Sequence, residues 1–286
     1  LSEPGLARLN AARAEGIDVT ANVYTYLAGA TGLDASMPPW VQEGGHDAWV
    51  ARLRDPATRA RVLREMRAPA QGWENLYQLT RGPQDVILIG FRNPELRGYT
   101  GQTLAQVAAA RGTSPEDTII DLVIADNSRV DTAYVLMSEE NLERNLRWPF
   151  TMLGSDAGSM APEGAFLQFN PHPRAYGNVA RFLGRYVRER QVMPLEEAIR
   201  RLTSLPAQSI AIRDRGSLRA GYFADVVIFD PATIADHSTF ENPHAYSTGV
   251  RDVFVNGEQV LRNGEHTGAR PGQVVRGPGW TGWDAE

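Results

Sequence analysis

The chain has 286 residues, a formal net charge of −5, no cysteine and no lysine, so all 29 basic residues are arginine. The absence of cysteine excludes disulfides, thiolate metal ligands and a cysteine nucleophile within the chain, and the absence of lysine excludes a Schiff base or a carboxylated-lysine metal bridge. The acidic balance and the scattered arginines give no reason to expect nucleic acid, and no apolar run is long enough for a membrane span.

The first segments predict a helix and then a strand. Apolar residues recur at helical spacing over residues 3–15, and residues 17–26 are rich in β-branched and aromatic side chains. Tyr24 and Tyr26 stand at the end of that strand, before a loop that contains glycine. Their rings could either pack in the core or face a ligand. The chain starts at Leu1 in what resembles the middle of a fold, so we expect it to be part of a longer protein.

The next stretch, residues 27–131, is too long for a simple connection, and we interpret it as an elaboration inserted between two strands. Residues 28–45 are rich in glycine and proline and predict a structured loop or lid. An arginine-rich helix, broken near Pro56, is predicted over 47–67, and a short strand over 85–90.

Residues 132–137 are the next predicted core strand, and a short helix after Ser138 leads to a buried strand at 150–155. Strand, helix and strand predict a βαβ unit with parallel strands. Asp156 follows the last strand with glycines on both sides, which let the backbone turn sharply. A carboxylate at the carboxyl end of a strand lies where α/β barrels place their chemistry. Asp156 could equally serve only as a turn residue.

The loop after Asp156 carries His172 between two prolines, followed by Arg174. The planar guanidinium of arginine matches a carboxylate, so Arg174 is a candidate for ligand binding. The alternative is that His172 and Arg174 hold the loop in place through hydrogen bonds.

The last part of the chain changes from helices to strands. Helices are predicted at 179–190 and 194–203. A buried strand at 226–229 and an Asn-Gly hairpin near Asn256 follow. We therefore predict a small β module over residues 213–286, packed on an α/β body.

Taken together and in this order, these motifs resemble the N-acyl-D-amino-acid deacylases (D-aminoacylases) of the amidohydrolase superfamily. The matching pieces are Gly154-Ser155-Asp156, His172-Pro173-Arg174, Tyr176-Gly177, Gly221 to Val227, Gly249-Val250, Val253 to Gly257, Asn22 to Tyr26 and Thr31-Gly32-Leu33. The resemblance implies an α/β fold: residues 1–212 would be the C-terminal part of a metal-dependent (β/α)8 barrel, with a small β-sandwich after it. Its sixth, seventh and eighth strands would be 17–26, 132–137 and 150–155.

The resemblance also implies a reaction, namely hydrolysis of the amide bond of an N-acyl-D-amino acid with the help of zinc. Asp156 would contact the metal and act as general base. Tyr24, Tyr26, His172 and Arg174 would contact the substrate. The five histidines show no metal-ligand spacing, so most zinc ligands are expected in a missing N-terminal part of the same protein.

Two other readings stay open from the sequence. One is a cyclic-amide hydrolase, similar to a hydantoinase or a dihydroorotase. The other is a non-catalytic, barrel-like protein that binds a partner. Histidine ligands upstream of Leu1 would favour an enzyme, and their absence would favour the binding protein.

Overall fold

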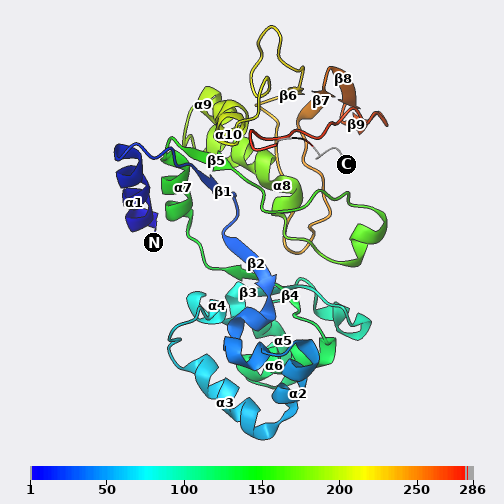
Figure 1. Cartoon of the computed structure of the whole chain (residues 1–286). Coiled ribbons are helices and arrows are strands. Elements are labelled where there is room, and N and C mark those ends of the chain that lie inside the picture. The colour runs from blue at the N-terminus through cyan, green and yellow to red at the C-terminus, as the bar shows by residue number, and fades with distance from the viewer. Residues whose placement is uncertain (1, 281, 283–286) are drawn as a thin grey trace.

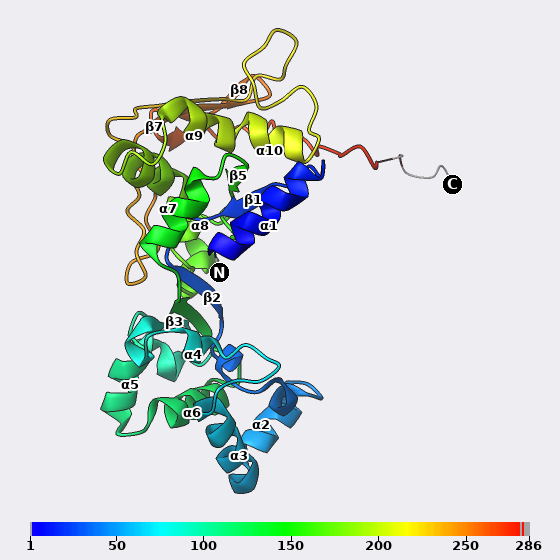
Figure 2. The same ribbon diagram turned by 90° about the vertical axis from the view of Figure 1, so that its left-hand side faces the viewer.

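The computed structural model describes residues 2–280 and 282, which form two lobes joined at a narrow waist (Figures 1 and 2). The middle of the chain, residues 28–135, forms one lobe, which we call the central lobe and which lies at the bottom of Figure 1. The other lobe, which we call the body, lies above it and holds the N-terminal helix and the C-terminal sheet. No helix within the described residues has the length and apolar character needed to cross a membrane.

Two short parallel strands lie at the centre of the body. They are β1 (Ala21–Val23) and β5 (Thr151–Leu153), paired so that Ala21 faces Thr151 and Val23 faces Leu153. Helices α1 (Ser2–Ala14) and α7 (Glu139–Arg147) lie beside this pair (Figure 2). The helix predicted at 3–15 is therefore confirmed, whereas the strand predicted over 17–26 is limited to three residues.

The predicted βαβ unit of residues 132–137 and 150–155 is wrong. Strand β4 (Asp131–Val135) lies in the central lobe and pairs antiparallel with both β2 (Ala28–Gly32) and β3 (Val86–Gly90). No strand separates β1 from β5, so residues 132–137 are not a barrel strand between them. Strand β2 also replaces the start of the predicted 28–45 loop, because pairing with β4 outweighs the low strand propensity of its glycines.

Helices pack against the antiparallel sheet of the central lobe on the side away from the body and enclose a core with it (Figures 1 and 2). Their bounds are η1 (Leu33–Ser36), η2 (Pro39–Gln42), α2 (His46–Arg54), α3 (Pro56–Arg67), α4 (Leu76–Leu79), η3 (Pro83–Asp85), η4 (Pro94–Tyr99), α5 (Leu104–Arg111) and α6 (Pro115–Asp126). The predicted break near Pro56 is confirmed: the Asp55 side chain caps α3 by accepting a 2.7 Å hydrogen bond from the amide of Thr58. Fully buried side chains from these helices and from the sheet, such as Leu53, Leu88 and Ile119, form one apolar cluster, which gives the lobe its own core.

A helical layer of the body packs closely against Tyr26 and against residues 230–249, which link the first two strands of the C-terminal sheet. It comprises η5 (Gly164–Gln168), α8 (Arg174–Arg181), the π-helix η6 (Phe182–Glu189), α9 (Leu195–Leu202) and α10 (Ser204–Ser209). A Cβ atom at Gly177 would lie 2.1 Å from the Tyr26 hydroxyl, and one at Gly184 would lie 2.6 Å from the Ile234 carbonyl oxygen. Glycine is thus required for this approach, which Arg188 secures by donating a 2.7 Å hydrogen bond to the Ile234 carbonyl.

The C-terminal sheet has the order β6-β7-β8-β9 and is antiparallel. Its strands are β6 (Val226–Phe229), β7 (Val250–Val255), β8 (Glu258–Arg262) and β9 (Glu265–His266). The Asn-Gly hairpin is confirmed between β7 and β8: Asn256 and Gly257 have φ angles of 51° and 84°, as a type I′ turn requires.

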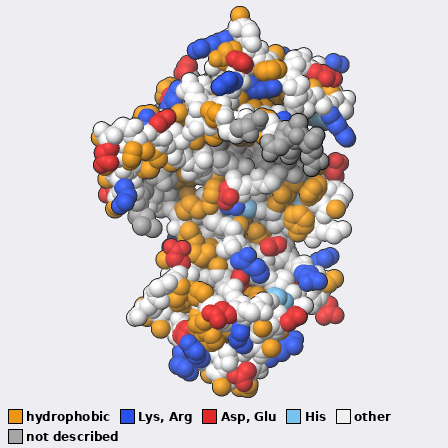
Figure 3. All heavy atoms as spheres, viewed as in Figure 1, with side chains coloured by type: hydrophobic (Ala, Val, Ile, Leu, Met, Phe, Trp, Pro, Cys, Tyr) orange, Lys and Arg blue, Asp and Glu red, His pale blue; other side chains and the backbone are white. Residues whose placement is uncertain are grey.

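Charged side chains are mixed over the visible surface. On the face shown in Figure 3, arginine and acidic side chains are interspersed over both lobes, without a single basic stripe.

Candidate active site

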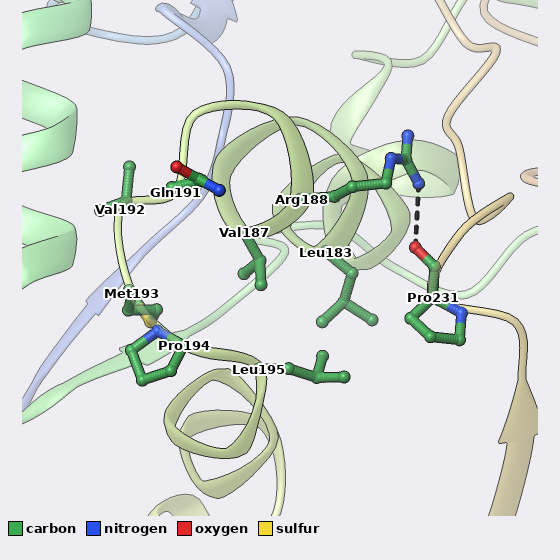
Figure 4. Close-up of a pocket in the computed structure, with 9 residues that line it drawn as sticks. All are labelled: Leu183, Val187, Arg188, Gln191, Val192, Met193, Pro194, Leu195 and Pro231. Atoms are coloured by element: carbon green, nitrogen blue, oxygen red, sulfur yellow. Dashed lines mark hydrogen bonds between the residues drawn. The ribbon is translucent and has the colours of Figure 1, made fainter.

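Three of the predicted site residues, Asp156, His172 and Arg174, line a cleft of about 280 Å³ between the body and the central lobe. The lining residues are Ala30, Thr31, Ile89 and Asp131 from the central lobe, and Asp156, Ala157, Gly158, Met160, Phe169, Asn170, Pro171, His172, Arg174 and Ala175 from the body. Another hollow, of about 550 Å³, lies beside η6, where Leu183, Val187 and Leu195 converge (Figure 4). Its lining contains no acidic residue and no histidine, so the cleft is the better candidate for chemistry.

Asp156 lies just past β5 and turns the chain into the cleft. Its φ angle of 49° places it in the left-handed region, which aspartate tolerates better than most residues. The side chain is 71% exposed, and its Oδ2 lies 2.8 Å from Nη2 of Arg174. The Asp156 backbone carbonyl accepts a second hydrogen bond, of 3.0 Å, from Nε of Arg174. The carboxylate is therefore accessible but held in one orientation.

Arg174 is the central cation of the cleft, and its side chain is only 8% exposed. Besides its contacts with Asp156, the guanidinium carbon lies 4.6 Å from the centre of the Tyr24 ring, close enough for a cation–π interaction. Its Nη1 atom is buried and has no hydrogen-bond partner among the atoms of the described residues. A buried donor of this kind is costly unless something binds it, so Nη1 is a candidate contact for an anionic ligand.

Tyr24 lies beside Arg174 rather than in the cleft lining. Burial raises the pKa of its hydroxyl, Asp156 adds to that rise, and Arg174 opposes it. The hydroxyl therefore stays protonated and able to donate a hydrogen bond.

His172 lines the cleft, but both of its ring nitrogens are already used. Its Nε2 donates a 2.9 Å hydrogen bond to the Ala28 carbonyl in the central lobe, and its Nδ1 accepts one of 3.0 Å from the amide of Arg174. Burial, helped by the charge of Arg174, lowers the pKa of His172 to about 4, so the ring is neutral at pH 7. The geometry therefore favours the alternative role of His172, as an anchor between the body and the central lobe.

Tyr26 does not reach the cleft, contrary to its predicted role in substrate contact. It is 6% exposed, and its hydroxyl donates a 3.1 Å hydrogen bond to Oδ2 of Asp236, which is also paired with Arg181 at 3.2 Å. Burial and the Asp236 carboxylate raise the pKa of Tyr26. Asp236 lies far along the chain, so no local pattern could have predicted this contact.

Two further residues of the site carried no recognisable sequence signal. Asn178 is buried behind the cleft. Its Oδ1 accepts a hydrogen bond of 2.8 Å from the amide of Thr25, and its Nδ2 donates one of 3.0 Å to the Gly154 carbonyl. It thereby fixes the chain after β1 to the chain after β5. Asp131, at the start of β4, places a second carboxylate on the cleft wall.

The residues at the cleft do not form a complete metal centre. No group of three or more histidine, aspartate or glutamate side chains in the described part of the chain is arranged to hold a metal ion. Asp156 is the predicted ligand, and its Oδ2 is bound by Arg174. A catalytic zinc site needs about three protein ligands, so these residues alone do not fit one.

Comparisons with known proteins indicate the family of the chain. Residues 37–261 match the model of the amidohydrolase family. The chain is 40% identical over 200 residues to a D-aminoacylase of Alcaligenes xylosoxydans xylosoxydans (67% of this chain, 38% of the relative). It is 40% identical over 183 residues to an N-acyl-D-aspartate deacylase of the same organism (63% of this chain, 34% of the relative).

The fold is also similar to solved structures. The structure of N-acyl-D-glutamate deacylase from Bordetella bronchiseptica, complexed with zinc and a phosphonate inhibitor, aligns with a TM-score of 0.68 at 30% identity. The alignment covers 96% of this chain and 46% of that one. The chain thus spans less than half the length of each of these relatives.

Proposed function

The chain belongs to the amidohydrolase family, and we propose that the protein hydrolyses the amide bond of N-acyl-D-amino acids, releasing a carboxylate and a D-amino acid. One observation carries this proposal: Asp156 and Arg174 line the same cleft, the Asp156 carboxylate is accessible, and the buried Nη1 of Arg174 has no hydrogen-bond partner among the described residues. In a substrate with a free α-carboxylate next to the scissile amide, Arg174 would bind the carboxylate and Asp156 would lie at the amide.

Arg174 is the proposed contact for the α-carboxylate of the substrate. Its buried Nη1 has no partner among the described residues while Nη2 remains on Asp156, and the neighbouring Tyr24 hydroxyl can donate a further hydrogen bond. Charge-assisted hydrogen bonds from a desolvated guanidinium are strong and directional. They would orient the amide of the same molecule toward Asp156.

Asp156 is the proposed general base. Its carboxylate would accept a proton from the water that attacks the amide carbon, and would return a proton to the nitrogen of the leaving D-amino acid. A general base must lie close to the reacting atoms. The left-handed backbone of Asp156 after β5 favours this position, because Asp156 lines the cleft.

Zinc is proposed as the cofactor on the basis of the relative solved with zinc. Because the described residues do not form a zinc site by themselves, we propose that most ligands lie in a part of the protein N-terminal to this chain, with Asp156 contributing one oxygen.

The proposed architecture follows from the strand pairing. We infer that β1 and β5, which are parallel and directly paired, are consecutive strands of a barrel, and that the central lobe is inserted between them. The sheet β6–β9 would be the small β-sandwich module after residue 212, and the remaining barrel strands would come from the N-terminal part.

The test is hydrolysis by the full-length protein, using N-acetyl-D-leucine, its L-enantiomer, hydantoin and dihydroorotate as substrates. We expect turnover of the D-enantiomer alone. Asp156→Asn should lower kcat by roughly a hundredfold or more and leave the melting temperature nearly unchanged, because the carboxylate is largely exposed. Turnover of a cyclic amide, or of none of the four compounds, would contradict the proposal, and near-normal kcat in the variant would remove Asp156 from the mechanism.

A further inference from the structure

Asp131 is the acidic residue that the central lobe contributes to the cleft. It begins β4, where it is in register with Gly32 of β2 and Gly90 of β3. A Cβ atom at Gly90 would lie 2.8 Å from Oδ2 of Asp131. Because Gly90 has no side chain, the Asp131 carboxylate has room to lie over this end of the sheet.

Within the described residues, the Asp131 side chain makes no hydrogen bond and no ion pair. The nearest candidate, Arg129, is engaged elsewhere: its Nε lies 2.8 and 2.9 Å from the two carboxylate oxygens of Asp34, and its Nη2 lies 3.3 Å from Oγ1 of Thr31. The Asp131 carboxylate is therefore available for a ligand in the cleft.

The rest of the wall around Asp131 is small and mostly apolar. Ala30 and Ile89 lie on the same side of the cleft, with Thr31 beside them. A ligand group that fits this wall has an aliphatic stem and a terminal cation. The stem would pass Ala30 and Ile89 and the cation would reach Asp131.

The chemistry of the substrate says which of its groups meets this wall. The α-carbon of an N-acyl-D-amino acid carries a carboxylate, an amide, a side chain and a hydrogen. The body provides Arg174 for the carboxylate and Asp156 for the amide. The side chain is the remaining large substituent. Besides the apolar Met160, Phe169 and Pro171 of the body, the cleft offers it the wall of the central lobe, which carries the Asp131 carboxylate.

We propose that Asp131 determines side-chain specificity, favouring N-acyl-D-amino acids with cationic side chains, such as D-arginine and D-lysine, and rejecting acidic ones. This inference rests on the proposed function. The proposed substrate preference differs from that in the names of the D-aspartate and D-glutamate deacylases among the relatives. The reason is that the Asp131 carboxylate on the wall would repel a carboxylate on the substrate side chain.

The experiment compares three N-acetyl-D-amino acids of similar length: D-arginine, D-norleucine and D-glutamate. We expect the full-length protein to prefer D-arginine to D-norleucine and to hydrolyse D-glutamate least. Asp131→Asn should lower the ratio of kcat/KM for D-arginine over D-norleucine by about tenfold, the effect of one charge pair in a partly desolvated site. Asp131→Arg should invert the order of D-arginine and D-glutamate.

Glu74→Gln is the matched control, because it removes one negative charge from an exposed position of the central lobe outside the cleft lining. It should leave all three kcat/KM values unchanged. The inference fails if the wild type prefers D-glutamate, if Asp131→Asn changes all three substrates equally, or if Glu74→Gln produces the same shift. Hydrolysis of none of the three substrates would overturn the proposed function and this inference with it, whereas hydrolysis without a role for Asp131 would overturn the inference alone.

Discussion

His172 should make the stability of the protein depend on pH. In the folded state burial, together with the nearby positive charge of Arg174, lowers its pKa from 6.5 to about 4, although the hydrogen bond to the Ala28 carbonyl opposes the shift. The unfolded chain therefore binds more protons between pH 6.5 and pH 4. The contribution of neutral His172 to stability is complete above pH 6.5 and is lost as the pH falls toward 4.

The magnitude follows from the size of this shift. Since one pKa unit corresponds to about 1.4 kcal/mol, lowering the pH from 7.0 to 4.5 should reduce the free energy of unfolding by about 2.5 kcal/mol through His172 alone. The side chain is only 6% exposed, so solvent screening should not reduce this value much.

The perturbation is His172→Gln, whose amide can still donate to the Ala28 carbonyl but does not titrate. Urea unfolding of the full-length wild type and variant should be followed by tryptophan fluorescence at both pH values. The wild type should lose about 2.5 kcal/mol more than the variant on acidification. His237→Gln, which removes an exposed histidine, is the control and should behave as the wild type does. Equal losses in the wild type and His172→Gln, or an NMR titration that gives His172 a pKa near 6.5, would refute the reasoning.

Two other predictions concern the substrate and the completeness of the site. Arg174→Lys should lower kcat/KM for N-acyl-D-amino acids by roughly tenfold or more, because lysine lacks the planar fork, with a much smaller loss for the corresponding α-amides; equal losses would indicate a purely structural Arg174. Residues 1–286 expressed alone should be poorly soluble, bind no stoichiometric zinc and show no amidohydrolase activity, because the edges of the β1–β5 pair lack partners in the described residues. Co-expression with the proposed N-terminal part should restore all three properties, and a soluble, zinc-loaded, active segment would contradict the prediction.

Elements that depend on local chemistry could be predicted from the sequence. The break at Pro56 follows from the fixed backbone of proline and the capping carboxylate of Asp55. The Ser138 side chain caps α7 by accepting from the amide of Asn141, and the Asn256-Gly257 turn adopts the positive φ angles that its residues tolerate. In each case the decisive partners lie within a few residues of one another.

Strand pairing and side-chain roles could not be predicted, because their partners are distant. Residues 132–137 have the pattern of a buried strand, but nothing in that pattern says whether the neighbour is β5 or β2. Tyr26 and His172 are candidates for substrate contact by their positions in the chain. Their functional groups are committed to Asp236, 210 residues away, and to Ala28, 144 residues away.

The same distant contacts explain how a cleft forms between two separately packed lobes. His172 binds the Ala28 carbonyl, and the amide of Asn170 donates a 3.3 Å hydrogen bond to the Ile89 carbonyl. The Phe240 side chain packs on Ala28, Ile89 and Ala133 of the central lobe. The body loop that leads to Arg174, the first residue of α8, is thus tied to the sheet that carries Asp131. The proposed substrate anchoring by the body and the proposed side-chain selection by the central lobe would therefore be held in one geometry, although the two parts have separate apolar cores.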